Sequence, residues 1–356
     1  MIGACPFIFS RFILSHDFHA ARNQVLKPAD MAEYNRTTCL QNTRLNVIKY
    51  VMEWIADESD DGKKVLWIYG LAGTGKSTLS TTIAQMMRGL RRLGPFFFNR
   101  DVLQMNCATW IRTLAYQLAT FDAGFGAAIS RVVAIHENIT GMPLGFQFAN
   151  LLSGNALKLA EWSGGLIILV FDALDEWGKE GDRKVSMQAL SNGLSGHPFF
   201  IRIIVVSRQE SVIQQALGSH PDVRPYPLNI ESATHKDVSQ FAQHHLEEIR
   251  TKDGFLAADW PGAVKVDAVA NGAGGLFIWA YIESHDPDKR LSELIDKQPE
   301  SNSSGPFAQL DSLYKLGLQS SGLWNLGLLQ HNRCDPVCTN SPVVFCHGCS
   351  PRITPT

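Results

Sequence analysis

Residues 70–78 combine residue types that bind phosphate. The segment reads GLAGTGKST and fits the pattern G-x-x-x-x-G-K-[ST]. Because glycine has no Cβ atom, such a loop can wrap an anion with its backbone N–H groups, and the N-terminus of a following helix adds a positive dipole. We expect the Lys76 ammonium to bridge the β- and γ-phosphates of a nucleoside triphosphate and the Ser77 hydroxyl to hold Mg²⁺. The predicted phosphate-binding residues are Gly70, Gly73, Thr74, Gly75, Lys76, Ser77 and Thr78.

The flanking sequence favours this phosphate site over a chance glycine-rich turn that carries a surface lysine. Before the loop lies VLWIY, an unbroken apolar run at residues 65–69, and after it apolar residues recur at helical spacing. The loop therefore joins a predicted buried strand to a predicted helix. Since a charge-assisted hydrogen bond contributes about 1.5–3 kcal/mol, loss of Lys76 should weaken nucleotide binding roughly 10- to 100-fold.

Three carboxylates follow a second apolar run, LIILVF at residues 166–171. A carboxylate at the carboxyl end of a strand beside the phosphate loop can share Mg²⁺ with a triphosphate, and we assign this role to Asp172. Asp175 and Glu176 are expected to orient or deprotonate a water at the γ-phosphate, with Asp175 preferred. The alternative is a solvated acidic loop at a strand end.

A third apolar run, IRIIVV at residues 201–206, leads to Ser207 and Arg208. A guanidinium at the end of a neighbouring strand can contact the γ-phosphate bidentately and report its presence. The alternative is an arginine that only pairs with a surface acid. The predicted catalytic residues are therefore Asp175, Glu176 and Arg208.

The apolar runs also predict the fold class. Runs at residues 65–69, 95–98, 166–171 and 201–206 do not alternate with polar residues, which indicates strands of a parallel sheet covered on both faces. Helical patterns lie between them. The expected fold is a three-layer, doubly wound α/β/α unit followed by a small helical domain.

A change of pattern near residue 230 divides the chain. The expected parts are an N-terminal flanking segment at 1–40, a nucleotide-binding domain at 41–230 with a leading helix at 42–56, a helical domain at 231–319, and a poorly ordered tail at 320–356.

Composition sets further bounds on function. The 356 residues carry a formal net charge of −2, so no general basic field for nucleic acid is expected. The longest apolar stretches are far shorter than the ~20 residues that cross a bilayer, and Arg11 interrupts the apolar start. The short apolar stretches predict no membrane partner, and an odd cysteine count with isolated members predicts the reduced thiols of a cytoplasmic protein. Four tail cysteines could bind zinc, but their spacing favours an unstructured thiol-rich tail: Cys334, Cys338, Cys346 and Cys349.

Taken together, GLAGTGKST, VFDALDEW and VVSRQE resemble the NACHT family of STAND P-loop nucleoside triphosphatases. Its fungal branch is suggested by CLQNTR, PFFFNRD, GLFIWA and LDSLYKLGL, and the resemblance covers about residues 39–318. It implies a five-stranded sheet in the order 5-1-4-3-2 and oligomerisation that depends on ATP or ADP. It also implies roles in innate-type recognition, programmed death or heterokaryon incompatibility.

The chain departs from this family in three ways. Members usually carry an effector domain before the switch and a repeat domain after it, and neither pattern is evident here, which suggests a truncated product. GGLF at residues 274–277 stands where many relatives have Gly-x-Pro. A winged-helix histidine for the β-phosphate is not evident either, which argues against tight locking on ADP.

The leading hypothesis is an ATP-binding, slowly hydrolysing switch in intracellular signalling that uses Mg²⁺ and self-associates or associates with other NACHT proteins. ATP is favoured over GTP because no N-K-x-D motif occurs. The alternative is a non-hydrolysing nucleotide-binding scaffold, or a truncated module that pairs with full-length relatives. A small-molecule kinase is disfavoured because no arginine-rich lid precedes Leu166.

Overall fold

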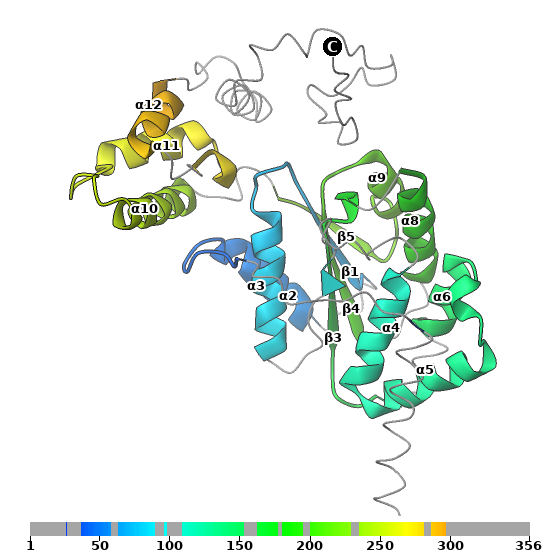
Figure 1. Ribbon diagram of the computed structural model, residues 1–356. Helices are drawn as coiled ribbons and strands as arrows, with labels where there is room; N and C mark the ends of the chain where they lie inside the picture. The colour runs from blue at the N-terminus through cyan, green and yellow to red at the C-terminus, as the bar shows by residue number, and fades with distance from the viewer. Residues whose placement is uncertain are drawn as a thin grey trace, which may run out of the picture. The chain divides into compact units, whose positions relative to one another are not determined.

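The computed structural model (Figure 1) describes residues 26, 37–57, 63–89, 96–97, 109–152, 162–176, 180–194, 200–228, 235–280 and 286–296. The chain divides into two compact units, one ending at Ser232 and the other beginning at Ala233. Sequence patterns placed this boundary at residues 230 and 231.

The first unit contains a five-stranded sheet in which every described pairing is parallel. The strand order is β2-β3-β4-β1-β5. Read from β5, this is the order 5-1-4-3-2 that the family resemblance implies. The strands are β1 (Val65–Tyr69), β2 (Phe96–Phe97), β3 (Ile167–Asp172), β4 (Ile201–Ser207) and β5 (Val223–Pro227).

Helices cover both faces of this sheet (Figure 1). One face carries α2 (Leu45–Ala56) and α3 (Lys76–Gly89). The other carries α4 (Trp110–Phe121), α5 (Ala123–Ile135), α6 (Leu144–Leu151), α8 (Glu180–Leu194) and α9 (Ser211–Leu217). Two 3-10 turns, η1 (Ile139–Gly141) and η2 (Leu174–Glu176), complete the described elements of this unit.

The central strands are buried on both sides, as their unbroken apolar sequences predict. In β1, Val65 and Trp67 belong to the apolar cluster under α4 to α9. Leu66 and Ile68, which point the opposite way, belong to the cluster under α2 and α3. The α/β class with a parallel sheet is therefore confirmed.

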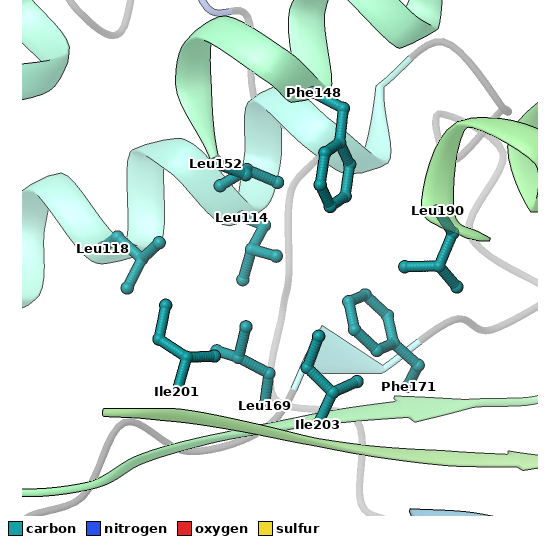
Figure 2. A pocket seen from close by; sticks show the side chains of 9 residues that line it. All are labelled: Leu114, Leu118, Phe148, Leu152, Leu169, Phe171, Leu190, Ile201 and Ile203. Atoms are coloured by element: carbon teal, nitrogen blue, oxygen red, sulfur yellow. The ribbon is translucent and has the colours of Figure 1, made fainter. Parts of the chain in front are cut away.

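A small apolar cavity lies between the sheet and the helices α4, α6 and α8 (Figure 2). It has a volume of about 20 Å³ and is lined by leucine, isoleucine and phenylalanine side chains, among them Leu114, Phe148 and Leu169. A space of this size could admit one water molecule, but it offers no polar partner. The cavity is thus a dry gap in the core.

Strand β5 was not among the predicted apolar runs. Its sequence, VRPYP, contains two prolines and is only partly buried, because β5 is the edge strand beside β1. The Leu228 N–H donates to the Tyr69 carbonyl of β1 at 2.6 Å. By alternation, Pro225 and Pro227 face away from β1, where a strand needs no N–H donor.

The leading helix is shorter than predicted. It was expected over residues 42–56 and begins at Leu45. Asn42 and Arg44 have left-handed backbone conformations, with φ of 64° and 60°. These conformations are incompatible with a right-handed helix and delay its start.

The second unit is helical, as predicted. It contains α10 (His235–Lys252), α11 (Ala263–Ala273), the 3-10 turn η4 (Phe277–Ala280) and α12 (Pro287–Asp296). The end of the predicted helical domain and the four tail cysteines lie outside the described residues. Across the ranges that the structure describes, no helix has the length and apolar character needed to cross a membrane.

Candidate functional site

The predicted phosphate loop, residues 70–78, connects the carboxyl end of β1 to the first turn of α3. Gly73 and Gly75 have φ of 78° and 77°, a region that residues with side chains rarely adopt. Gly70 is required for a different reason, because a Cβ atom there would lie 2.6 Å from the Leu228 carbonyl oxygen. The loop's glycines thus permit both its curvature and its contact with the chain beyond β5.

Hydroxyl groups hold the loop in this shape. The Thr74 hydroxyl donates to the Leu71 carbonyl at 2.8 Å, and the Thr78 hydroxyl donates to the Gly75 carbonyl at 2.8 Å. Thr74 is only 1% exposed. Its own carbonyl accepts a hydrogen bond from the Arg44 guanidinium, which lies just before α2. The loop is therefore braced internally and from outside.

Lys76, the first residue of α3, turns its ammonium group toward the loop. Nζ donates to the Gly70 carbonyl at 3.0 Å and to the Leu71 carbonyl at 2.7 Å. Both acceptors belong to the phosphate loop itself. The ammonium thus lies over the loop with backbone carbonyls as its partners, and its contact with phosphate stays a prediction.

Burial lowers the pKa of Lys76 from 10.5 to about 8. The charge of Asp175 opposes this shift most strongly, the Arg208 guanidinium adds to it, and Asp172 and Glu176 also oppose it. Coulomb interactions fall with distance, so the predicted acids and the predicted sensor arginine all lie close enough to act on this one amine.

Asp172 ends strand β3 and is 1% exposed. The next residue, Ala173, has a left-handed φ of 58°, and its N–H donates to the Val206 carbonyl of β4 at 3.0 Å. This turn redirects the chain into η2, which carries Asp175 and Glu176. Both acids therefore follow Asp172 at the carboxyl edge of the sheet.

Arg208 joins the two candidate catalytic acids. Its backbone N–H donates to Asp175 Oδ1 at 3.0 Å, and its Nε lies 3.2 Å from Asp175 Oδ2. Its Nη2 lies 3.6 Å from Glu176 Oε1. The Asp175 side chain is 4% exposed, whereas that of Arg208 is 51% exposed. The sequence predicted that Arg208 either senses the phosphate or pairs with a surface acid. In the structure it pairs with two acids, the buried Asp175 and the half-buried Glu176.

A second ion pair lies next to this group and was not predicted. Arg183 of α8 lies 3.5 Å from Glu210, two residues after Arg208. Burial raises the pKa of Glu210, Arg183 opposes this, and the charges of Asp175 and Arg208 also act on it. Alternating charges therefore extend from the phosphate loop to α8.

The residues present fit a bound Mg²⁺ ion. This ion prefers a small number of oxygen ligands and retains several waters. Asp172 supplies a carboxylate at the sheet edge, and Ser77 supplies an exposed hydroxyl in the first turn of α3. The charge of Asp172 reaches Lys76, the neighbour of Ser77 in sequence. Asp172 therefore lies near the residue that precedes Ser77, and joint coordination of a metal ion by the two side chains stays a prediction.

Most predicted site residues are brought together, and one important residue was missed. The loop, Asp172, Asp175, Glu176 and Arg208 all lie at the carboxyl edge of the sheet. Arg44 was quoted only as part of CLQNTR, with no role assigned. Its contact with the loop depends on packing across 30 residues of sequence, which spacing cannot show.

Comparisons with known proteins give one family match over part of the chain and one distant structural similarity. The family model described as "Nephrocystin 3, N-terminal" matches residues 47–208, from α2 through Arg208. No curated protein matches the chain. A solved structure titled "Structure of C. elegans PCH-2" is similar with 14% sequence identity and a TM-score of 0.39, covering 77% of this chain and 70% of that one. A structural similarity this low supports no conclusion about the fold or the function of this chain.

Proposed function

We propose that this chain is a P-loop nucleoside triphosphatase that binds ATP or ADP with Mg²⁺ and hydrolyses ATP slowly. The observation that carries the proposal is the convergence of Lys76 with Asp172, Asp175 and Arg208 on one edge of the parallel sheet. Ligands of such sheets bind outside the carboxyl ends of the strands. A loop with backbone N–H groups and an ammonium, facing carboxylates, is the arrangement that a metal-bound triphosphate requires.

The residues divide between binding and chemistry. The loop and Lys76 hold the phosphates, and Ser77 and Asp172 would hold Mg²⁺, which neutralises charge on the triphosphate. In hydrolysis a water oxygen bonds to the γ-phosphorus as the bond to the β-phosphate oxygen breaks. Asp175 orients this water and accepts its proton, and Glu176 lies beside it as a second acceptor.

Arg208 couples the phosphate to the acids. In the described structure its guanidinium is engaged by Asp175 and Glu176. A γ-phosphate carries more negative charge than either carboxylate and competes for the same donors. Binding of ATP should therefore draw Arg208 away from Asp175, which leaves the carboxylate available to water, and ADP should not.

Nucleotide titration tests the binding part of this proposal. The parent protein should bind Mg–ATP, and Lys76→Ala should bind it at least 10-fold more weakly, as measured by calorimetry. Lys184→Ala, at an exposed position on α8, is the matched control and should keep parent affinity. Equal affinity of Lys76→Ala and the parent would refute the assignment of the loop.

A non-hydrolysing nucleotide-binding scaffold is the second candidate, and one observation favours it. Asp175 accepts a backbone N–H at one carboxylate oxygen and contacts a guanidinium with the other, so both oxygens already have partners in place of a water. Single-turnover assays with the parent and Asp175→Ala separate the two functions. Phosphate release by the parent that is lost in the variant supports the enzyme, whereas no release from either supports the scaffold.

The signalling role follows only from the resemblance to the NACHT family. We propose that ATP drives self-association, or association with other NACHT proteins in the cytoplasm, and that hydrolysis limits its duration. Light scattering of the purified chain with ATP, ADP or no nucleotide tests this. A particle mass that is the same in all three states would contradict it.

A further inference from the structure

Arg44 contacts the phosphate loop from outside the loop's own sequence. It immediately precedes α2 and is 2% exposed. Its Nη2 donates to the backbone carbonyl of Thr74, a residue in the middle of the phosphate loop. It is unusual for a guanidinium to be buried against a main-chain carbonyl, because burial removes the water that hydrates its charge. This contact therefore requires an explanation beyond surface pairing.

The segment that carries Arg44, residues 37–44, is fixed to the loop's helix at a second point. The Cys39 N–H donates to the Thr82 hydroxyl of α3 at 2.8 Å. Helix α2 then packs Val47 and Val51 into the same apolar cluster as Leu79 of α3. Arg44 is thus held on a rigid base relative to the loop.

Because of peptide geometry, this contact also fixes the orientation of one peptide group in the loop. The peptide bond between Thr74 and Gly75 is trans, because the one cis bond among the described residues joins Trp260 to Pro261. In a trans peptide the C=O and N–H bonds point in opposite directions. By holding the Thr74 carbonyl, Arg44 directs the Gly75 N–H away from residues 37–44. Gly75, with its φ of 77°, would otherwise allow this peptide plane to rotate.

The backbone of Arg44 supports a specific role. Its φ is 60°, a left-handed value that is unfavourable for a residue with a long side chain. Arg44 is the N-cap residue of α2: its carbonyl accepts a hydrogen bond from the Ile48 N–H at 3.0 Å, but its side chain makes no capping hydrogen bond to the helix. The side chain is instead bonded to the loop, through the Thr74 carbonyl. Strain of this kind persists where the surrounding structure holds a functional geometry.

We propose that Arg44 is a positioning residue for the phosphate loop: it fixes the Thr74–Gly75 peptide so that the Gly75 N–H faces the bound phosphate. The inference rests on the proposed function, because it assumes that the loop binds phosphate. The ligand class is any Mg²⁺-bound diphosphate or triphosphate group, since the contact acts on the part of the loop that holds phosphate.

Calorimetry with three ligands tests this role: Mg–ATP, Mg–ADP and Mg–pyrophosphate. Arg44→Gln should weaken all three by one common factor of about 10 or more, because a charge-assisted bond is lost and the peptide is released. Arg44→Lys should weaken all three about 3- to 10-fold, since an ammonium on a shorter stem keeps the charge and part of the contact. Leu114→Ala, which removes buried apolar volume on the other face of the sheet, should lower the melting temperature without changing any Kd.

The outcomes separate this inference from the proposed function. If the parent binds none of the ligands, the proposed function fails and the role of Arg44 fails with it. If the parent binds but Arg44→Gln binds equally well, the inference alone is wrong. Weaker binding of ATP and ADP with unchanged pyrophosphate would place Arg44 on the nucleoside side and overturn it. Should Arg44→Gln not fold, parent affinity in Arg44→Lys decides against the inference.

Discussion

Raising the pH from 7 to 9 should weaken Mg–ATP binding about tenfold. The pKa of Lys76 in the nucleotide-free protein is lowered to about 8, mainly by burial. A triphosphate favours the charged amine, so ATP binds the protonated form. The apparent Kd is then proportional to a factor equal to one plus the ratio of neutral to protonated Lys76. This factor is about 1.1 at pH 7 and about 11 at pH 9.

The stability of the nucleotide-free protein should change in the opposite direction. In the unfolded chain the pKa of Lys76 is 10.5, whereas in the folded chain it is about 8, so the folded chain loses this proton at lower pH. Between these values the unfolded state binds more protons, so the contribution of Lys76 to stability rises with pH. As the pH rises, the affinity for Mg–ATP should therefore fall while the contribution of Lys76 to folding stability increases. General alkaline denaturation cannot produce this combination.

Calorimetric titration at constant ionic strength and saturating Mg²⁺ measures the affinity. Lys76→Arg is the matched control, because a guanidinium does not titrate in this range. Its Kd should be flat between pH 7 and 9. A flat profile in the parent, or the same slope in both proteins, would show that the buried amine does not control binding.

Three further substitutions test other parts of the structure. Asp175→Asn should reduce single-turnover hydrolysis by about 100-fold or more while ATP affinity stays within about threefold, and unchanged turnover would exclude it as the base. Gly70→Ala should cost about 1–3 kcal/mol in urea unfolding, because its Cβ would lie 2.6 Å from the Leu228 carbonyl, whereas Gly145→Ala meets no atom within 4 Å and should not destabilise. Leu114→Ala, at the cavity in Figure 2, should lower the free energy of unfolding by about 2–5 kcal/mol. It should not alter nucleotide affinity, because Leu114 lies on the other face of the sheet from α3, and a changed Kd would contradict that separation.

The sequence predicted those parts of the fold that are governed by burial. Strands β1, β3 and β4 are covered on both faces, so their sequences are apolar except for Arg202 near the start of β4, and their ends could be located. The places of Asp172 and Arg208 at the sheet edge could be predicted because Asp172 follows one such run directly and Arg208 follows another after Ser207. Strand β5 lacks this signal, since an edge strand tolerates Pro225 and Pro227 and buries little.

Contacts between distant segments could not be predicted from spacing. The bond from Arg44 to the Thr74 carbonyl depends on a left-handed residue and on the packing of α2 against α3. The bridge from Arg208 to Asp175 depends on the left-handed turn at Ala173, a residue type that gives no hint of such a turn. Sequence named the participants at the sheet edge but not which of them pair in the folded chain.

The prolines of β5 limit how copies of this protein can associate. Pro225 and Pro227 occupy successive outward positions of the strand and have no N–H to offer. A second sheet added at this border would lack two rungs of its hydrogen-bond ladder, so continuous sheets across subunits are disfavoured there. An assembly that met at this border would have to join through side chains, unlike a fibril built by strand addition.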